Sequence, residues 1–387
     1  MSDDSRKPKI ALIVSGGGAR AAYQVGVLKA IAEILPADAP NPFHIICGTS
    51  AGAINSAALA VYAHNFRLAV TRLLQVWGFF RVHHVFRADV LGILATSARW
   101  WAALLFGGLR QRNPAALFDR RPLSALLRRY LPCEKIQEAI DAGHLHALAI
   151  TASGYGSGES VTFFQATAGV PDWRRAGRVG CRTAIGHEHL LASSAIPFLF
   201  EAVKIHREYF GDGSMRQIAP LGPALHLGAD RLLAIGVRQE NSAPAARAEG
   251  EGAYPSLAQM GGHVLNSIFL DALEVDIERL DRVNQALRTT PQLRSPETGG
   301  KLRPVTTLKI SPSRDLREIA ERHKHHFPWP IRFLLRGVGA YQRGGSDLMT
   351  YLLFEKPFCR ELIELGYRDA MVHKDDIARL FAADGGE

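Results

Sequence analysis

The sequence lacks the features that mark several large classes of protein. It contains four cysteines, no two of them close together: Cys47, Cys133, Cys181 and Cys359. The paired spacings of zinc sites are therefore absent, and separated thiols are typical of a reducing compartment. No run of about 18 uncharged apolar residues predicts a transmembrane helix, the first residues do not resemble a secretory signal, and no acidic loop suggests calcium. We expect a cytoplasmic protein without a bound metal or cofactor.

The sequence also has fewer acidic than basic residues. The 387 residues include 46 lysines and arginines against 37 acids, a net charge of +9. Such an excess favours an anionic partner, whether nucleic acid, an acidic membrane surface or an anionic substrate, and it equally serves solubility alone. The excess is local, because eleven arginines and only two acids, Asp89 and Asp119, occur between Arg67 and Arg129. We expect an anion-attracting surface there.

The order of predicted elements indicates an α/β fold. Two short apolar runs, 9–15 and 43–48, are each followed by a glycine-containing turn and a helical pattern, at 19–35 and 51–62. This order is typical of buried parallel strands joined by helices. Further strands are predicted at 145–153, 160–166, 202–210, 231–237 and 305–311, helices over most of 64–130 and 312–384, and an exposed loop at 239–256.

The strongest chemical motif is Gly48-Thr49-Ser50-Ala51-Gly52. It fits the pattern G-x-S-x-G and lies between a predicted strand and an alanine-rich helix, where a nucleophile elbow must lie. A sharp strand-to-helix turn leaves no room for side chains beside the serine, which explains the two glycines. The motif predicts that Ser50 is a nucleophile and that the N–H of Ala51 can stabilise an oxyanion. The alternative is a tight turn without catalytic meaning.

A second glycine loop, Gly16-Gly17-Gly18, follows the first predicted strand. Because parallel strands end at the same edge of a sheet, its backbone N–H groups could reach the substrate of Ser50. A tight turn between strand and helix is the simpler alternative. The loop also loosely matches a dinucleotide fingerprint, which predicts an acid near the end of the second strand; Cys47 lies there instead and argues against nucleotide binding.

Taken together, these motifs resemble those of the patatin-like phospholipases. That family carries a glycine loop followed by a basic residue, here Gly16 to Arg20, then the Ser50 elbow, then an Asp-Gly pair, here Asp212-Gly213. Residues 117–127 and 192–197 also resemble shared segments, so the likeness covers about residues 9–240. One departure is Ser214, where the family more often has glycine or alanine.

The resemblance implies a three-layer α/β/α fold with a mostly parallel sheet and a helical C-terminal extension. It divides the chain into a catalytic domain at 9–240, a loop and helices completing the core at 241–311, and the extension at 312–387. It further implies a Ser50–Asp212 dyad, with the glycine loop as oxyanion hole, that hydrolyses acyl esters of phospholipids or lysophospholipids. Since a carboxylate is a poor base at its ordinary pKa, burial must raise the pKa of Asp212.

A histidine triad is not indicated. None of the fifteen histidines is singled out by its spacing, and Ser50 follows the second predicted strand, earlier than the elbow of α/β-hydrolases. The rival function is a catalytically silent patatin fold that binds lipid or acts as a scaffold.

Two interpretations remain open for one residue, Arg20, and for two segments of the chain. Arg20 either binds an anionic group of the substrate or makes a structural contact to a helix end. Residues 88–108, with Trp100 and Trp101, and residues 329–335 form either lipid-surface helices or helices packed on the core. The expected partners are a lipid substrate and a membrane surface contacted peripherally, without nucleic acid.

Overall fold

The chain folds around one mixed sheet whose central strands are parallel. The computed structural model describes residues 7–87, 116–239, 254–269, 271–290, 302–342 and 345–382. The strand order is β10-β9-β1-β2-β3-β4-β6-β5, and β8 pairs with both β3 and β7. The strands are β1 (Ile10–Val14), β2 (Ile45–Thr49), β3 (Ala147–Gly154), β4 (Ser160–Ala166), β5 (Trp173–Arg175), β6 (Arg178–Arg182), β7 (Val203–Ile205), β8 (Glu208–Asp212), β9 (Arg231–Ile235) and β10 (Thr306–Ile310).

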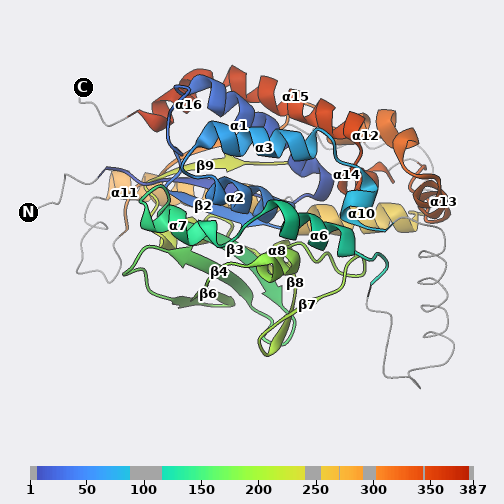
Figure 1. The fold of residues 1–387 in the computed structure, drawn as a ribbon, viewed down its shortest axis with the longest axis horizontal. Coiled ribbons are helices and arrows are strands. Elements are labelled where there is room, and N and C mark those ends of the chain that lie inside the picture. The colour runs from blue at the N-terminus through green and yellow to red at the C-terminus, as the bar shows by residue number, and fades with distance from the viewer. Residues whose placement is uncertain are drawn as a thin grey trace, which may run out of the picture.

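Helices cover both faces of the sheet, as the α/β/α prediction requires (Figure 1). They are α1 (Ala22–Ile34), α2 (Ala51–Val61), α3 (Phe66–Trp77), α4 (Val82–Val85), α6 (Arg121–Tyr130), α7 (Lys135–Asp141), α8 (His187–Ser193), α9 (Gly222–His226), α10 (Leu257–Phe269), α11 (Asp271–Thr289), α12 (Leu316–His323), α13 (Trp329–Gly337), α14 (Ser346–Leu352), α15 (Lys356–Val372) and α16 (Lys374–Phe381). Three 3-10 turns accompany them: η1 (Gly18–Ala21), η2 (Gly213–Arg216) and η5 (Lys324–His326).

The hydrophobic clusters on the two faces of β1 follow the alternation of side chains along the strand. On β1, Leu12 and Val14 pack with α1, α2 and α15, whereas Ala11 and Ile13 pack on the opposite face with α9 and α11. The fold class predicted from the sequence is therefore confirmed.

One predicted strand is wrong in detail. Residues 202–210 form not a single strand but the hairpin β7–β8, which turns at His206 with a φ of 52°. The polar pair His206-Arg207 occupies the turn, so the apolar run is split there. Asp212, which lies beyond the predicted strand, is the last residue of β8 and pairs with Ala152 of β3. The short strands β5 and β6 had no clear signal in the sequence.

The C-terminal helices share the core of the N-terminal strands. Helix α15 lies against α1 (Figure 1), so closely that a Cβ at Gly26 would collide with the carbonyl oxygen of Ile363. Pro330 and Pro357 lie in the first turns of α13 and α15, where proline is favoured. Among the described helices none is long and apolar enough to span a membrane. Residues 88–108, predicted as a surface or cap helix, lie outside the described residues, as does most of the loop predicted at 239–256.

Candidate active site

Ser50 sits on a strained elbow between β2 and α2. Its backbone has a φ of 56° and a ψ of −129°, a conformation that non-glycine residues rarely adopt. A Cβ at Gly52 would collide with the carbonyl oxygen of Val14, and one at Gly48 would lie 2.7 Å from the Cα of Ala53. The two glycines of the motif are therefore needed because the backbone of the turn is packed against its neighbours.

The Ser50 hydroxyl donates a hydrogen bond to Asp212 across 2.6 Å, between Oγ and Oδ2. Both side chains are buried, Ser50 being 2% exposed and Asp212 fully covered. The second carboxylate oxygen of Asp212 accepts from the backbone N–H of Ser214 at 3.0 Å. A Cβ at Gly213 would collide with the carbonyl oxygen of Thr151, so the glycine after the aspartate lets the chain turn beside β3.

Burial raises the pKa of Asp212 from 3.8 to about 7. The hydrogen bonds from Ser50 and Ser214 and the positive charge of Arg120 act in the opposite direction and hold the pKa from rising further. A carboxylate with a pKa near neutrality can accept a proton at neutral pH and return it in a later step.

Residues 192–197 accept hydrogen bonds from the backbone N–H groups of both Ser50 and Asp212. The Ser193 hydroxyl accepts from the N–H of Ser50 at 2.9 Å and donates to the carbonyl of Thr151 at 2.6 Å. The carbonyl of Ala195 accepts from the N–H of Asp212 at 2.9 Å. The segment was noted in the sequence only as a family likeness; its role in joining the elbow to β8 appears in the structure.

Arg120 was missed by sequence reasoning. Its half-buried side chain donates to the carbonyl of Leu191 and, at 2.6 Å, to the carbonyl of Glu201, so it contacts both ends of the segment that holds Ser50 and Asp212. Burial lowers its pKa to about 10, while the charges of Glu201 and Asp212 act to raise it. The only available signal was its place within the family-like segment 117–127.

The glycine loop divides into parts with different surroundings. Gly18, with a φ of 56°, lines the same cavity as Ser50 and Ala51. A Cβ at Gly18 would collide with the carbonyl oxygen of Tyr351, so α14 fixes the course of the loop. Gly17, with a φ of 157°, packs against Val237, and Gly16 faces Ser214 and Phe269 away from this cavity.

Arg20 makes structural contacts and does not line the cavity. It is 3% exposed, donates to the Thr350 hydroxyl at 2.7 Å and to the Asn266 side chain at 3.2 Å, and lies 4.2 Å from the centre of the Tyr351 ring. Of the two interpretations of Arg20, the structure shows the contact to helix ends, here those of α10 and α14.

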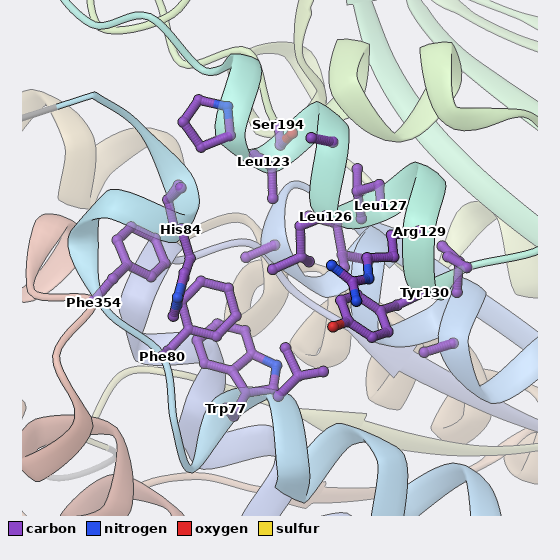
Figure 2. Close-up of a pocket in the computed structure, with 18 of the residues that line it drawn as sticks. Trp77, Phe80, His84, Leu123, Leu126, Leu127, Arg129, Tyr130, Ser194 and Phe354 are labelled. Carbon is purple, nitrogen blue, oxygen red and sulfur yellow. The ribbon is translucent and has the colours of Figure 1, made fainter.

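A cavity of about 940 Å³ extends from Ser50 between α2, α3, α4 and α6. Most of its lining is apolar. Figure 2 shows Phe80, His84 and Phe354 on one side, Arg129 and Tyr130 on the other, and Leu123, Leu126 and Leu127 between them. No histidine in the described ranges hydrogen-bonds to Ser50 or Asp212, and those ranges hold no cluster of potential metal ligands.

A serine on a strand–helix elbow, hydrogen-bonded to a buried aspartate in a three-layer α/β fold, defines a class of hydrolytic enzymes that use a serine nucleophile. The model of the family "Patatin-like phospholipase" matches residues 12–225, more than half of the chain, and the protein belongs to this family. Membership of the family supports lipid acyl hydrolase activity in general.

Two further comparisons add little detail. Among solved structures, the chain is similar to VipD from Legionella pneumophila, with 12% sequence identity and a TM-score of 0.34; the match covers 96% of this chain and 67% of that one. No curated protein matches the sequence.

Proposed function

We propose that the protein cleaves ester bonds of lipids, phospholipid or lysophospholipid acyl chains among them, through a Ser50–Asp212 dyad. The observation that carries the proposal is the 2.6 Å hydrogen bond between these two buried side chains beside an apolar cavity of about 940 Å³. Ligand pockets span roughly 300–1,000 Å³, so the cavity lies at the upper end of that range and has room for an acyl chain.

In the first half of the reaction, the Ser50 oxygen attacks the ester carbonyl while its proton passes to Asp212 Oδ2. The tetrahedral intermediate then expels the alcohol, which takes that proton from Asp212, and the acyl group remains on Ser50. In the second half a water molecule gives a proton to Asp212 and attacks the acyl carbon, and Ser50 recovers the proton as the fatty acid leaves. Asp212 thus ends each cycle ionised.

The oxyanion of each intermediate needs donors that are already in place. The N–H groups of Gly18 and Ala51 are the best candidates, because both residues line the cavity beside Ser50. Ala51 is also the first residue of α2, whose N-terminal end carries partial positive charge. Gly16 and Gly17 would act less directly, by setting the path of the loop that presents Gly18.

Peripheral contact with a lipid surface would bring the enzyme to its substrate, and among the described helices α13 has side chains suited to such a contact. Trp329 and Phe333 are 58% and 74% exposed, one helical turn apart, while Ile331 and Leu335 anchor the opposite side of the helix in the core. Basic residues lie on and just before the helix, at Arg332, Arg336 and Lys324. Exposed aromatic and basic side chains on one helix favour an anionic lipid interface.

Co-sedimentation with phosphatidylglycerol vesicles tests this contact. Trp329→Ala/Phe333→Ala should bind several-fold less than the wild type, whereas Val372→Ala, which removes a side chain 81% exposed on α15, should bind normally. Equal binding by all three proteins would refute a role for α13.

Hydrolysis of a chromogenic acyl ester tests the reaction itself. Ser50→Ala and Asp212→Asn should each lower kcat by about 10³-fold or more. Asp276→Asn is the matched control, since Asp276 is a buried aspartate with a raised pKa on α11, across the sheet. Near-normal activity of Asp212→Asn would contradict the dyad. Loss of activity on replacing His189 or His187, with the fold retained, would point to a triad instead.

A further inference from the structure

The two ends of the cavity differ in chemistry. The indole N–H of Trp77 donates to Asn55 at 2.8 Å, which places the C-terminal end of α3 beside the second turn of α2, five residues after Ser50. The aromatic side chains Trp77, Phe80 and Phe354 gather at this end. Helix α3 packs on α2, and only four residues join the end of α2 to the start of α3, so the two helices run antiparallel. Arg72, five residues before Trp77, therefore lines the cavity farther from Ser50.

The far end is basic. Arg72 of α3 and the adjacent pair Arg128 and Arg129 of α6 line the cavity and are exposed. Figure 2 shows Arg129 beside Tyr130 at this end, and the guanidinium lies 5.3 Å from the centre of that ring. The one carboxylate among the described residues that line the cavity is Glu134.

These arginines have no carboxylate partner among the described residues. Arg72 donates only to the amide of Gln75, at 3.3 Å. Elsewhere on the surface, arginines such as Arg174 are paired with acids, here Glu159 at 2.7 Å. Arg128 and Arg129 stand in the last turn of α6, where cations are favoured by the helix dipole alone. That explanation does not extend to Arg72, which comes from the middle of another helix and lines the same cavity.

We propose that this basic end binds a phosphate-bearing alcohol portion of the substrate, so that the enzyme prefers net-anionic glycerophosphate esters over zwitterionic or neutral ones. The proposal rests on the proposed function, because it assigns the acyl chain to the aromatic end and the scissile ester to Ser50. Guanidinium groups suit it chemically, since they bind phosphate oxygens with two parallel hydrogen bonds.

The spacing agrees with such a substrate. Asn55 lies five residues beyond Ser50, and Arg72 lies five residues before Trp77, the partner of Asn55 on the antiparallel α3, so Arg72 is about 15 Å from Ser50 along the helices at the ordinary rise of an α-helix. An arginine side chain reaching back along the cavity covers part of that distance. The remaining gap suits a short alcohol unit between an ester and a phosphate.

The test compares three octanoyl esters supplied as monomers, below the concentration at which they form micelles, so that attraction to a lipid surface plays no part. They are the lysophosphatidic acid, the lysophosphatidylcholine and the monoacylglycerol, which differ only in the alcohol portion. We expect kcat/KM for the first to exceed that for the other two by about tenfold, as three exposed charge interactions of ordinary strength would give. Raising the ionic strength should shrink this preference.

The variant Arg72→Gln/Arg128→Gln/Arg129→Gln should bring the three kcat/KM values to within about twofold of one another. Arg288→Gln, which removes one exposed positive charge from α11 on the other side of the sheet, should keep the wild-type preference. An Arg72→Gln single variant with an intermediate preference would show that α3 contributes and that α6 does not act alone.

Two results would overturn the inference while leaving the proposed function standing: a wild type without preference among the esters, or a triple variant that keeps it. If the wild type hydrolyses none of the three, nor a chromogenic ester, the proposed function fails first and the inference with it.

Discussion

Replacing Asp212 by asparagine should stabilise the protein at neutral and alkaline pH while abolishing its activity. The side chain is fully buried, and its charge is therefore costly to keep in the fold. Asparagine has nearly the same shape. It can accept from the N–H of Ser214 with its oxygen and donate to the Ser50 hydroxyl with its amide, so both hydrogen bonds of the wild type have counterparts.

The magnitude follows from the pKa of Asp212, about 7 in the fold against 3.8 in an unfolded chain. Above pH 4 the unfolded chain loses a proton that the folded protein keeps, so wild-type stability falls, relative to the asparagine variant, until the pH passes about 7. At 1.36 kcal/mol per unit of pKa, the cost of the ionisable group is roughly 2 kcal/mol at pH 5 and roughly 4 kcal/mol at pH 8.

Urea denaturation of both proteins at pH 5, 6, 7 and 8 measures this difference. The difference in the free energy of unfolding between Asp212→Asn and the wild type should increase by about 2–3 kcal/mol from pH 5 to pH 8. Ser50→Ala is the control, because it is also inactive but keeps the buried carboxylate. Its stability should fall between pH 5 and pH 8 at least as much as that of the wild type, since the hydrogen bond from Ser50 that lowers the pKa of Asp212 is lost. A difference that does not change with pH would refute the raised pKa of Asp212 and the argument for it as a base.

Three other substitutions test the surroundings of the dyad. Arg120→Met should move the acidic limb of the kcat/KM profile to higher pH, because the positive charge that lowers the pKa of Asp212 is lost. Arg120→Lys keeps a positive charge, so its acidic limb should lie close to that of the wild type. Identical profiles for Arg120→Met and the wild type would contradict this. Ser193→Ala should cost about 1–3 kcal/mol of stability, measured by urea denaturation, because the buried N–H of Ser50 loses its acceptor; unchanged stability would show that the N–H finds another partner. Gly18→Ala should lower kcat by at least about 10²-fold, since the Cβ would meet Tyr351 and displace an oxyanion donor; full activity would remove Gly18 from the oxyanion hole.

The fold class was accessible from the sequence because the central strands are buried on both faces. The apolar runs at 9–15 and 43–48 became β1 and β2 within one or two residues at each end. The hairpin at 203–212 was not accessible, because its two short strands are joined by a tight turn at His206 that carries no glycine signal. The edge strands β5 and β6 are partly exposed and polar, so they lack the apolar pattern on which the prediction relied.

The hydrogen bond between Ser50 and Asp212 joins residues 162 positions apart, and periodicity alone could not pair them. The family resemblance named both, and the structure brings them together. The resemblance did not single out Arg120, Ser193 or Tyr351, because their roles arise from contacts that involve backbone carbonyl and N–H groups. Such contacts depend on the path of the chain and leave no mark on spacing or composition. Arg20 is the opposite case. The motif singled it out in the sequence, but its contacts to α10 and α14 could not be predicted because those helices lie far along the chain.

The central claim is that Ser50 is a nucleophile activated by Asp212, and covalent labelling tests it most directly. A fluorophosphonate probe should modify the wild type at pH 8, and mass spectrometry of the digested protein should place the adduct on the peptide that contains Ser50. Ser50→Ala should not be labelled, and Asp212→Asn should be labelled far more slowly. Labelling that persists in Ser50→Ala, or an adduct on another residue, would contradict the account.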